Sequence, residues 1–299
     1  MKRIFKILGV VLLIIIAGAA IFLMTYQPEK YSDFGVFADL RSHVLTALQE
    51  HRATERPVTK DFQGFTLNLS FPFSKVFGSN AVGIPLASFE TDRISVATIS
   101  QFEVPPKSGY CRDFTLNIRP RYEYRAPVFH IDFMKPSPGV PGLCTADFFN
   151  VDTGNISLET FFGSELENVR KALSMVEKYQ RTIKEGRGRI TKYLDPWKST
   201  YRIELKEPPT RDETVRREYY ETAQSAIKLY LSAYLKSLYK LQPDPGYAQR
   251  HEEKTCEIVL ALYKNDVAIS LGKKIFKEQF RKYWLDGFWN VQVELKDEK

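Results

Sequence analysis

The sequence has few of the residues, and none of the short motifs, on which the commonest catalytic and cofactor sites depend. It contains three cysteines and four histidines in 299 residues, and these show neither CxxC nor His-Glu-x-x-His spacing. It has no Walker loop, no glycine-rich dinucleotide fingerprint and no nucleophile elbow. P-loop, Rossmann and serine-hydrolase chemistry are therefore not indicated, and a metal site has no support.

Disulfides are not indicated either. Cys111 and Cys144 open alternate strands of a predicted meander, which separates them by two strand spacings, or about 9.5 Å. A disulfide needs Cα atoms within roughly 7 Å, so we expect no bridge between them.

Excess charge is also small. The net charge is +7, and residues 1–29 contain three basic residues, Lys2, Arg3 and Lys6, and one acidic residue, Glu29, so residues 30–299 carry about +5. The composition, 43% hydrophobic and 26% charged, is that of a globular protein. The weak and dispersed excess suits an acidic protein partner or an anionic ligand and argues against nucleic acid.

One long hydrophobic run is present, at residues 7–24. About 20 apolar residues suffice for a helix to span a bilayer, so the run predicts a single-pass membrane helix. A cleaved signal peptide with its processing site at 17–20 is the alternative, but the run continues to Met24, which favours a retained anchor. The positive-inside rule then leaves the N-terminus in the cytoplasm and the body in the periplasm or lumen. We therefore expect an anchor at 1–29 and one domain at 30–299.

The order of predicted elements indicates an α+β fold. An amphipathic helix at 33–51 precedes strands near 64–71, 94–104, 112–119, 127–134 and 143–150. Helices follow near 159–184, 213–242, 248–264 and 269–286, with one strand at 201–206. The strands are joined by short loops, which favour antiparallel neighbours, and the helices would cover the sheet.

Asp132 is the most informative residue of the predicted sheet. Side chains alternate faces along a strand, so Phe129, Ile131 and Phe133 share one face while His130 and Asp132 share the other. The strand at 112–119 alternates in the same way. An ionisable pair facing a cavity suggests proton chemistry, whereas a solvated sheet face would need no function.

Two further features allow both a structural and a functional interpretation. Asn265 and Asp266 interrupt two apolar helices, and Asp266 would serve as an N-cap even if it had no other role. The tyrosines of the helix at 213–242 are typical of a buried aromatic stripe whose polar tips reach water.

These residues together resemble the ferredoxin-dependent bilin reductases. Residues 127–132 are similar to the family's Pro-Ile/Met-Phe-Gly-x-Asp strand, and three other features fall at family distances. They are Pro120 twelve residues before Asp132, Glu103 at the place of the second catalytic carboxylate, and Lys264-Asn265-Asp266 followed by Phe276, Trp284 and Phe288-Trp289.

The resemblance implies a three-layer α/β/α sandwich whose mostly antiparallel sheet holds a linear tetrapyrrole. It implies no bound flavin or metal, with single electrons arriving from ferredoxin or another one-electron donor. Asp132, Glu103 and Asp266 would then be the catalytic carboxyls. The substrate-binding candidates are Thr115, Asn265 and Asn117, together with Arg119, Arg121 and Arg125 for ligand carboxylates; a solvated sheet edge is the alternative for these arginines.

Two departures from the family pattern keep a second function open. Thr115 replaces a histidine or asparagine and cannot titrate, and His130 replaces a small residue, usually glycine. His130 would either take over the missing imidazole's catalytic role or fill the pocket. The sequence thus predicts a membrane-anchored bilin reductase, with a non-enzymatic tetrapyrrole-binding or structural module on the same fold as the alternative.

Overall fold

The computed structural model describes residues 33–56, 66–68, 80–83, 86–104, 111–135, 141–180 and 194–291. Within these residues no helix combines the length and apolar character needed to cross a bilayer. The expected anchor at 7–24 lies outside the described residues.

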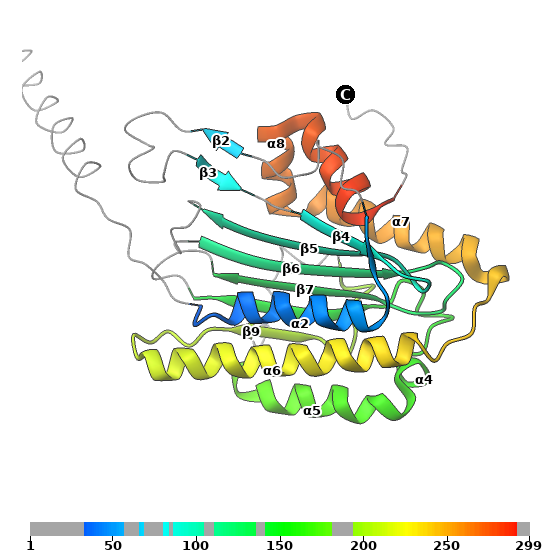
Figure 1. Cartoon of the computed structure of the whole chain (residues 1–299), viewed down its shortest axis with the longest axis horizontal. Helices are drawn as coiled ribbons and strands as arrows, with labels where there is room; N and C mark the ends of the chain where they lie inside the picture. The colour runs from blue at the N-terminus through cyan, green and yellow to red at the C-terminus, as the bar shows by residue number, and fades with distance from the viewer. Residues whose placement is uncertain are drawn as a thin grey trace, which may run out of the picture.

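A single antiparallel sheet forms the middle of the structure (Figure 1). Every pairing in the described part is antiparallel, and the main path runs β1-β4-β5-β6-β7-β8-β9. β3 also pairs with β5, and β2 with β3. The strands are β1 (Thr54–Glu55), β2 (Thr66–Asn68), β3 (Asn80–Gly83), β4 (Leu86–Glu90), β5 (Ile94–Val104), β6 (Cys111–Pro120), β7 (Val128–Lys135), β8 (Leu143–Phe149) and β9 (Ile203–Lys206).

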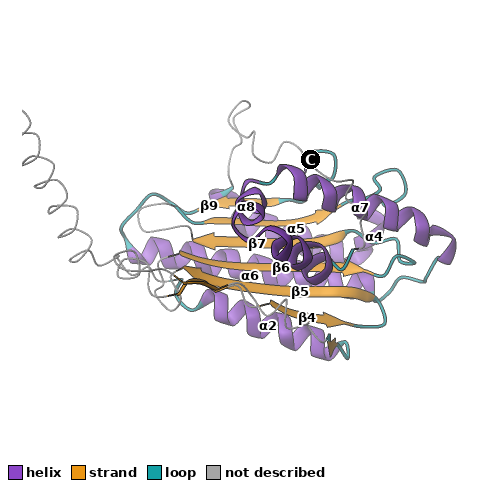
Figure 2. Cartoon of the chain, turned by 90° about the horizontal axis from the view of Figure 1, so that it is seen from above, coloured by secondary structure: helices purple, strands orange, loops and turns teal. Residues whose placement is uncertain are grey.

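Helices cover both faces of this sheet, as the views from the side and from above show (Figures 1 and 2). One layer contains α2 (Val36–Glu50), α4 (Leu158–Phe162), α5 (Leu166–Val176) and α6 (Glu213–Leu238). The other contains α7 (Ala248–Asn265), α8 (Val267–Lys282) and the π-helix η6 (Tyr283–Trp289). The expected α+β class and three-layer arrangement are confirmed.

The two layers enclose two separate hydrophobic cores. Phe129, Ile131 and Phe133 of β7 belong to the core beneath α2, α5 and α6, together with the buried tyrosines of α6. Val128 belongs to the second core, which the residues of α7, α8 and η6 dominate. The period-two alternation of β7 therefore separates its side chains as the sequence predicts.

Two expected helices differ from the structure. The helix predicted at 159–184 ends at Phe162, because Gly163 adopts a φ of 50° that a continuing right-handed helix cannot accommodate, and α5 begins only at Leu166. The helix predicted at 269–286 begins at Val267 and changes to a π-helix at Tyr283. The short strands β1, β3 and β4 were not predicted.

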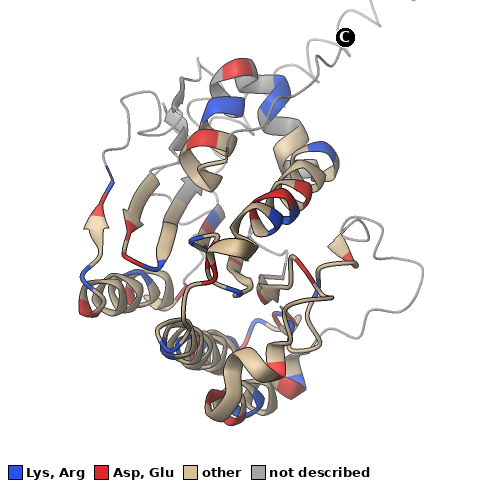
Figure 3. Ribbon diagram, turned by 90° about the vertical axis from the view of Figure 1, so that its right-hand side faces the viewer, with Lys and Arg blue, Asp and Glu red and all other residues tan. Residues whose placement is uncertain are grey.

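Other expectations hold. Cys144 is a buried free thiol, so it forms no disulfide. Tyr219, Tyr220, Tyr230 and Tyr234 are fully buried in the first core, which confirms the aromatic stripe. Contrary to the prediction, their polar tips do not reach water, and the hydroxyls of Tyr230 and Tyr234 donate to the carbonyls of Tyr201 and Pro127. Both signs of charge occur on each of α2, α5, α6, α7 and α8, and Figure 3 shows acidic and basic residues interspersed on the helices.

Candidate functional site between the sheet and the C-terminal helices

The polar face of the sheet is built from cross-strand rows of side chains. The strand register aligns Ser100, Thr115, Asp132, Thr145 and Glu204 in one row across β5 to β9. The next row aligns Thr98, Asn117, His130 and Asp147. Residues far apart in the sequence are thereby gathered on one face.

The C-terminal helices cover part of this face. The Thr98 hydroxyl donates to the Phe288 carbonyl at 2.9 Å, and the Ser100 and Tyr283 hydroxyls lie 3.4 Å apart. Both contacts join β5 to the π-helix η6, a type of helix often found at functional sites. In this region the polar face is therefore an interior surface and not a solvated one.

Asp132 is half-buried on this face, next to a second carboxyl, that of Asp113. Asp113 is buried, with 6% of its surface exposed, and its Oδ2 accepts a hydrogen bond from Thr115 Oγ1 at 2.7 Å. Burial raises the pKa of Asp132, and burial and the neighbouring Asp132 raise the pKa of Asp113 well above its ordinary value. At neutral pH this arrangement favours a carboxyl that keeps its proton.

Asp266 approaches the same group from the start of α8. Its Oδ1 accepts the Ile269 N–H at 3.1 Å, which confirms that Asp266 caps this helix. The charge of Asp266 also raises the pKa of Asp132. The structural and the functional interpretations of Asp266 are thus compatible.

His130 and its surroundings form the other half of the face. Its ring stacks on Phe149, with centroids 5.5 Å apart. Burial and the nearby Arg202 guanidinium lower the pKa of His130 to about 4, so the imidazole is neutral at pH 7. Burial raises the pKa of Asp147 to about 6, although Ser199 hydrogen bonds and Arg202 oppose the change. His130 is therefore placed as a neutral aromatic group and not as a cationic acid.

Several polar atoms on this face are buried without a hydrogen-bond partner in the described part of the chain. They are both amide atoms of Asn117, Nδ1 of His130, and Nε and Nη1 of Arg202. Arg202 Nη2 lies 3.1 Å from Glu204 Oε2 and Nη1 lies 3.8 Å from Asp147 Oδ2, so the guanidinium is fixed while its Nε remains available. Buried groups of this kind normally find partners, so their clustering suggests a polar ligand.

The three arginines predicted to hold ligand carboxylates all have protein partners. Arg119 is 2% exposed, and its Nη2 donates to Ser95 Oγ at 2.6 Å and to the Asn290 carbonyl at 3.0 Å, while its buried Nε and Nη1 have no hydrogen-bond partner in the described part of the chain. Arg121 Nε donates to the Thr91 carbonyl at 3.0 Å. Arg125 is exposed and binds Asp244 with Nη2 at 2.7 Å from Oδ2. Each of these contacts supports the fold.

Two other candidates lie at the margin of the site. Asn265 is exposed, and its amide donates to the Ala261 carbonyl in the last turn of α7 at 2.8 Å. The backbone of Glu103 pairs with Arg112 of β6, and its side chain lies outside the described part.

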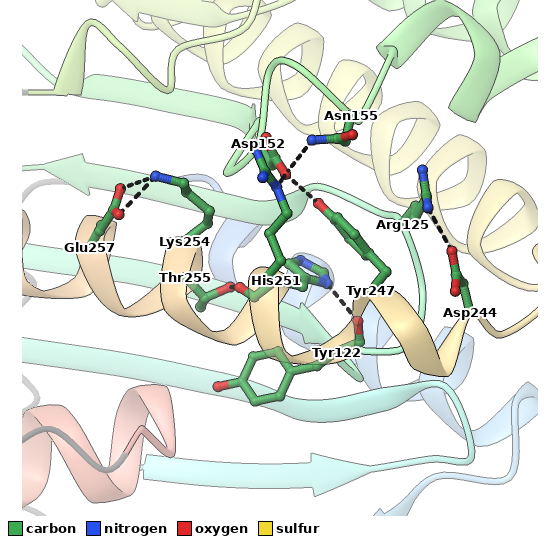
Figure 4. Close-up of polar contacts among 11 residues, drawn as sticks. Tyr122, Arg125, Asp152, Asn155, Asp244, Tyr247, His251, Lys254, Thr255 and Glu257 are labelled. Carbon is green, nitrogen blue, oxygen red and sulfur yellow. Dashed lines mark hydrogen bonds and ion pairs between the residues drawn. The ribbon is translucent and has the colours of Figure 1, made fainter.

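The start of α7 is attached to the end of β8 by Asp152, a residue that sequence analysis did not identify (Figure 4). Its carboxylate accepts hydrogen bonds from Arg250 Nε at 2.5 Å, Asn155 Nδ2 at 2.9 Å and the Tyr247 hydroxyl at 3.1 Å. These donors, Arg250 first, lower the pKa of Asp152 to about 2. The contact holds the C-terminal layer at the end of the sheet.

Two further residues of the face, Asp113 and Arg202, were not proposed as site residues from the sequence, although its alternation placed Asp113 on the polar face. Asp113 alternates with Phe114 and Leu116 in the same pattern that singled out Asp132, so a signal was present. Arg202 comes from a strand about 70 residues after Asp132 in the sequence, and no local pattern links the two.

Comparison of the sequence with protein-family models finds no match, and comparison with curated proteins finds no match. The fold is similar to the crystal structure of phytochromobilin synthase from tomato in complex with biliverdin. The TM-score is 0.64 and the sequence identity 11%, and the alignment covers 85% of this chain and 82% of that chain. At this identity, the likeness shows a shared fold.

Proposed function

We propose that the chain is a membrane-anchored oxidoreductase that reduces a linear tetrapyrrole, with protons supplied by carboxyl groups on the polar face of the sheet. One observation carries the proposal: Asp132, Asp113 and Asp266 converge where the sheet meets α8. The fold around them is similar to that of phytochromobilin synthase, whose solved complex holds biliverdin.

Proton supply is the step for which this chain offers its own groups. Reduction of one carbon–carbon double bond consumes two electrons and two protons. Asp132 is the proposed direct donor, since burial raises its pKa and thereby favours the protonated form that a proton donor needs. After each transfer, a proton from solvent would restore the carboxyl. Glu103 remains a proposed donor to a terminal ring.

The unpartnered groups of the face suit the other parts of such a substrate. Linear tetrapyrroles carry carboxylates, and the buried Nε of Arg202 is available to donate to one. The amide of Asn117 and Nδ1 of neutral His130 can bond to pyrrole or carbonyl groups. We assign Arg202 the anion-binding role that the sequence suggested for other arginines.

Electrons would come from outside the chain, since the proposal includes no bound cofactor. The donor would be ferredoxin or another acidic one-electron carrier, consistent with the charge of about +5 on residues 30–299.

A tetrapyrrole-binding module without redox turnover is the second candidate. Two observations favour it: Thr115 has no titratable group and uses its hydroxyl to bond Asp113, and His130 is neutral and stacked on Phe149. Both candidates require ligand binding, and they differ in whether the bound ligand is reduced.

Titration of the detergent-solubilised full chain with biliverdin, followed by anaerobic electron supply from a ferredoxin system, tests both candidates. We expect a shifted and sharpened red absorbance, then its loss as reduced bilin forms. A shift without reduction would support the binding module, and an unchanged spectrum at tens of micromolar bilin would contradict both.

Arg202→Met and Arg125→Met form a matched pair for this titration. Loss of a charge-assisted hydrogen bond costs about 1.5–3 kcal/mol, so Arg202→Met should weaken binding by about 10- to 100-fold. Arg125 is exposed and bound to Asp244, so Arg125→Met should bind as the wild type does.

A further inference from the structure

Asp113 is a buried acid to which the proposed reaction assigns no role. In the register of β6 and β7, Asp113 pairs with Met134 and Thr115 with Asp132, so the two aspartates are diagonal neighbours on one face. Their carboxyl groups lie within hydrogen-bonding reach of each other. Two carboxylates cannot form such a bond unless one of them carries a proton.

The hydrogen bonding of Asp113 supports this conclusion independently. Its Oδ2 accepts from Thr115 Oγ1 and the Phe114 N–H also acts on the carboxyl, but the buried Oδ1 has no hydrogen-bond partner in the described part of the chain. A proton shared between Asp113 and Asp132 provides the missing donor. Since buried polar atoms are normally bonded, the protonated pair accounts for an atom that would otherwise be unsatisfied.

Among the described residues, the groups that interact with the pair do not neutralise a double negative charge. Tyr283 of η6 interacts with Asp113, Asp266 at the start of α8 interacts with Asp132, and Cys144 of β8 interacts with Asp132. Tyr283 and Cys144 are neutral near pH 7, because burial raises the pKa of each. Asp266 adds negative charge, so retention of one proton by the pair is favoured.

We infer that Asp113 is a positioning residue for the proposed donor, and that it holds one proton jointly with Asp132 between strands β6 and β7. The inference rests on the proposed function of Asp132. The pair carries one proton and a net charge of −1; transfer of the proton to the substrate leaves −2, and a proton from water restores −1. Asp113 thereby keeps the proton hydrogen-bonded until the substrate accepts it.

Titration of the detergent-solubilised full chain without bilin tests the pair directly. Aspartate carboxyl ¹³C NMR should show two well-separated steps, because strongly interacting sites titrate as a pair. In Asp113→Asn, Asp132 should instead titrate in a single step. The midpoint of that step should differ by more than about one pH unit from each of the two apparent pKa values of the wild-type pair. Asp147→Asn is the control. It should remove the carboxyl signal of Asp147 and leave both titration steps of the Asp113–Asp132 pair unchanged.

Thr115 provides a second variant that keeps both acids. Its hydroxyl stabilises the charged form of Asp113, so Thr115→Val should move the upper step of the pair to higher pH, and Thr115→Ser should restore it. If Asp132 titrates identically in the wild type and in Asp113→Asn, the inference is wrong. A paired titration without any bilin reduction would instead contradict the proposed function and leave the proton-sharing pair established.

Discussion

At Asp132, one substitution separates proton transfer from structural support. Asp132→Asn keeps the shape of the side chain and removes the transferable proton. General acid–base groups contribute about 10²- to 10⁴-fold, so single-turnover bilin reduction should fall by that factor while bilin binding survives. Normal turnover in the variant would remove Asp132 from the mechanism.

The stability of the same variant provides the control. Because burial raises the pKa of Asp132 in the folded state, this group stabilises the fold below about pH 4 and loses that contribution as pH rises through the folded pKa. Asp132→Asn should therefore be as stable as the wild type at pH 7, or more so, in urea denaturation. A loss of about 1–3 kcal/mol would instead indicate a structural hydrogen bond.

At the residue scale, local alternation was sufficient to identify the polar face but not its contacts. The alternation around Asp132 predicted which side chains share that face, and the register confirms the pattern for Thr115, Asn117 and His130. The contact between Asp113 and Asp132 depends on the relative register of two strands, which short-range patterns do not determine. Arg202 reaches the face through the pairing of β8 with β9, two strands that are much further apart in the sequence than β6 and β7.

At the element scale, the errors of prediction have identifiable causes. Gly163 interrupts a helical pattern, and a lone glycine in such a pattern is compatible with either continuation or a break. β1, β3 and β4 contain two, four and five residues, too few for alternation to emerge clearly. The π-helix at Tyr283–Trp289 depends on tertiary contacts with β5 and therefore has no local signature.

The attachment of α7 to β8 should depend on Asp152 and on pH. Asp152→Asn exchanges a buried acceptor of three hydrogen bonds for an amide, which should lower the free energy of unfolding at pH 7 by about 1–3 kcal/mol. Because the folded pKa of Asp152 is lowered to about 2, its contribution exists above about pH 4 and is lost as pH falls toward 2.

Urea denaturation across this pH range measures the effect. The difference between the wild type and Asp152→Asn should narrow steadily below pH 4. Asp244→Asn is the matched control, because Asp244 binds Arg125 in an exposed ion pair that contributes little. Equal destabilisation by the two substitutions would show that burial of Asp152 has no special effect.

At the scale of the whole molecule, the proposed anchor and the proposed reaction place a joint constraint on the electron donor. The positive-inside rule directs residues 30–299 away from the cytoplasm, because Lys2, Arg3 and Lys6 precede the apolar run at 7–24. A cytoplasmic ferredoxin could not reach a site on the opposite side of the membrane. The donor must therefore share the compartment of the sheet, or the chain must have the opposite orientation.

Mass spectrometry of the mature N-terminus and protease accessibility in sealed vesicles distinguish these possibilities. We expect residues 7–24 to remain in the mature protein and the body to lie on the non-cytoplasmic side. Replacement of Lys2, Arg3 and Lys6 by glutamine should weaken this orientation, because these cations favour the cytoplasmic side. A mature chain that begins near Ala20 would show that the run is a signal peptide. A retained anchor with a cytoplasmic body would contradict the predicted orientation and make a cytoplasmic ferredoxin accessible to the site.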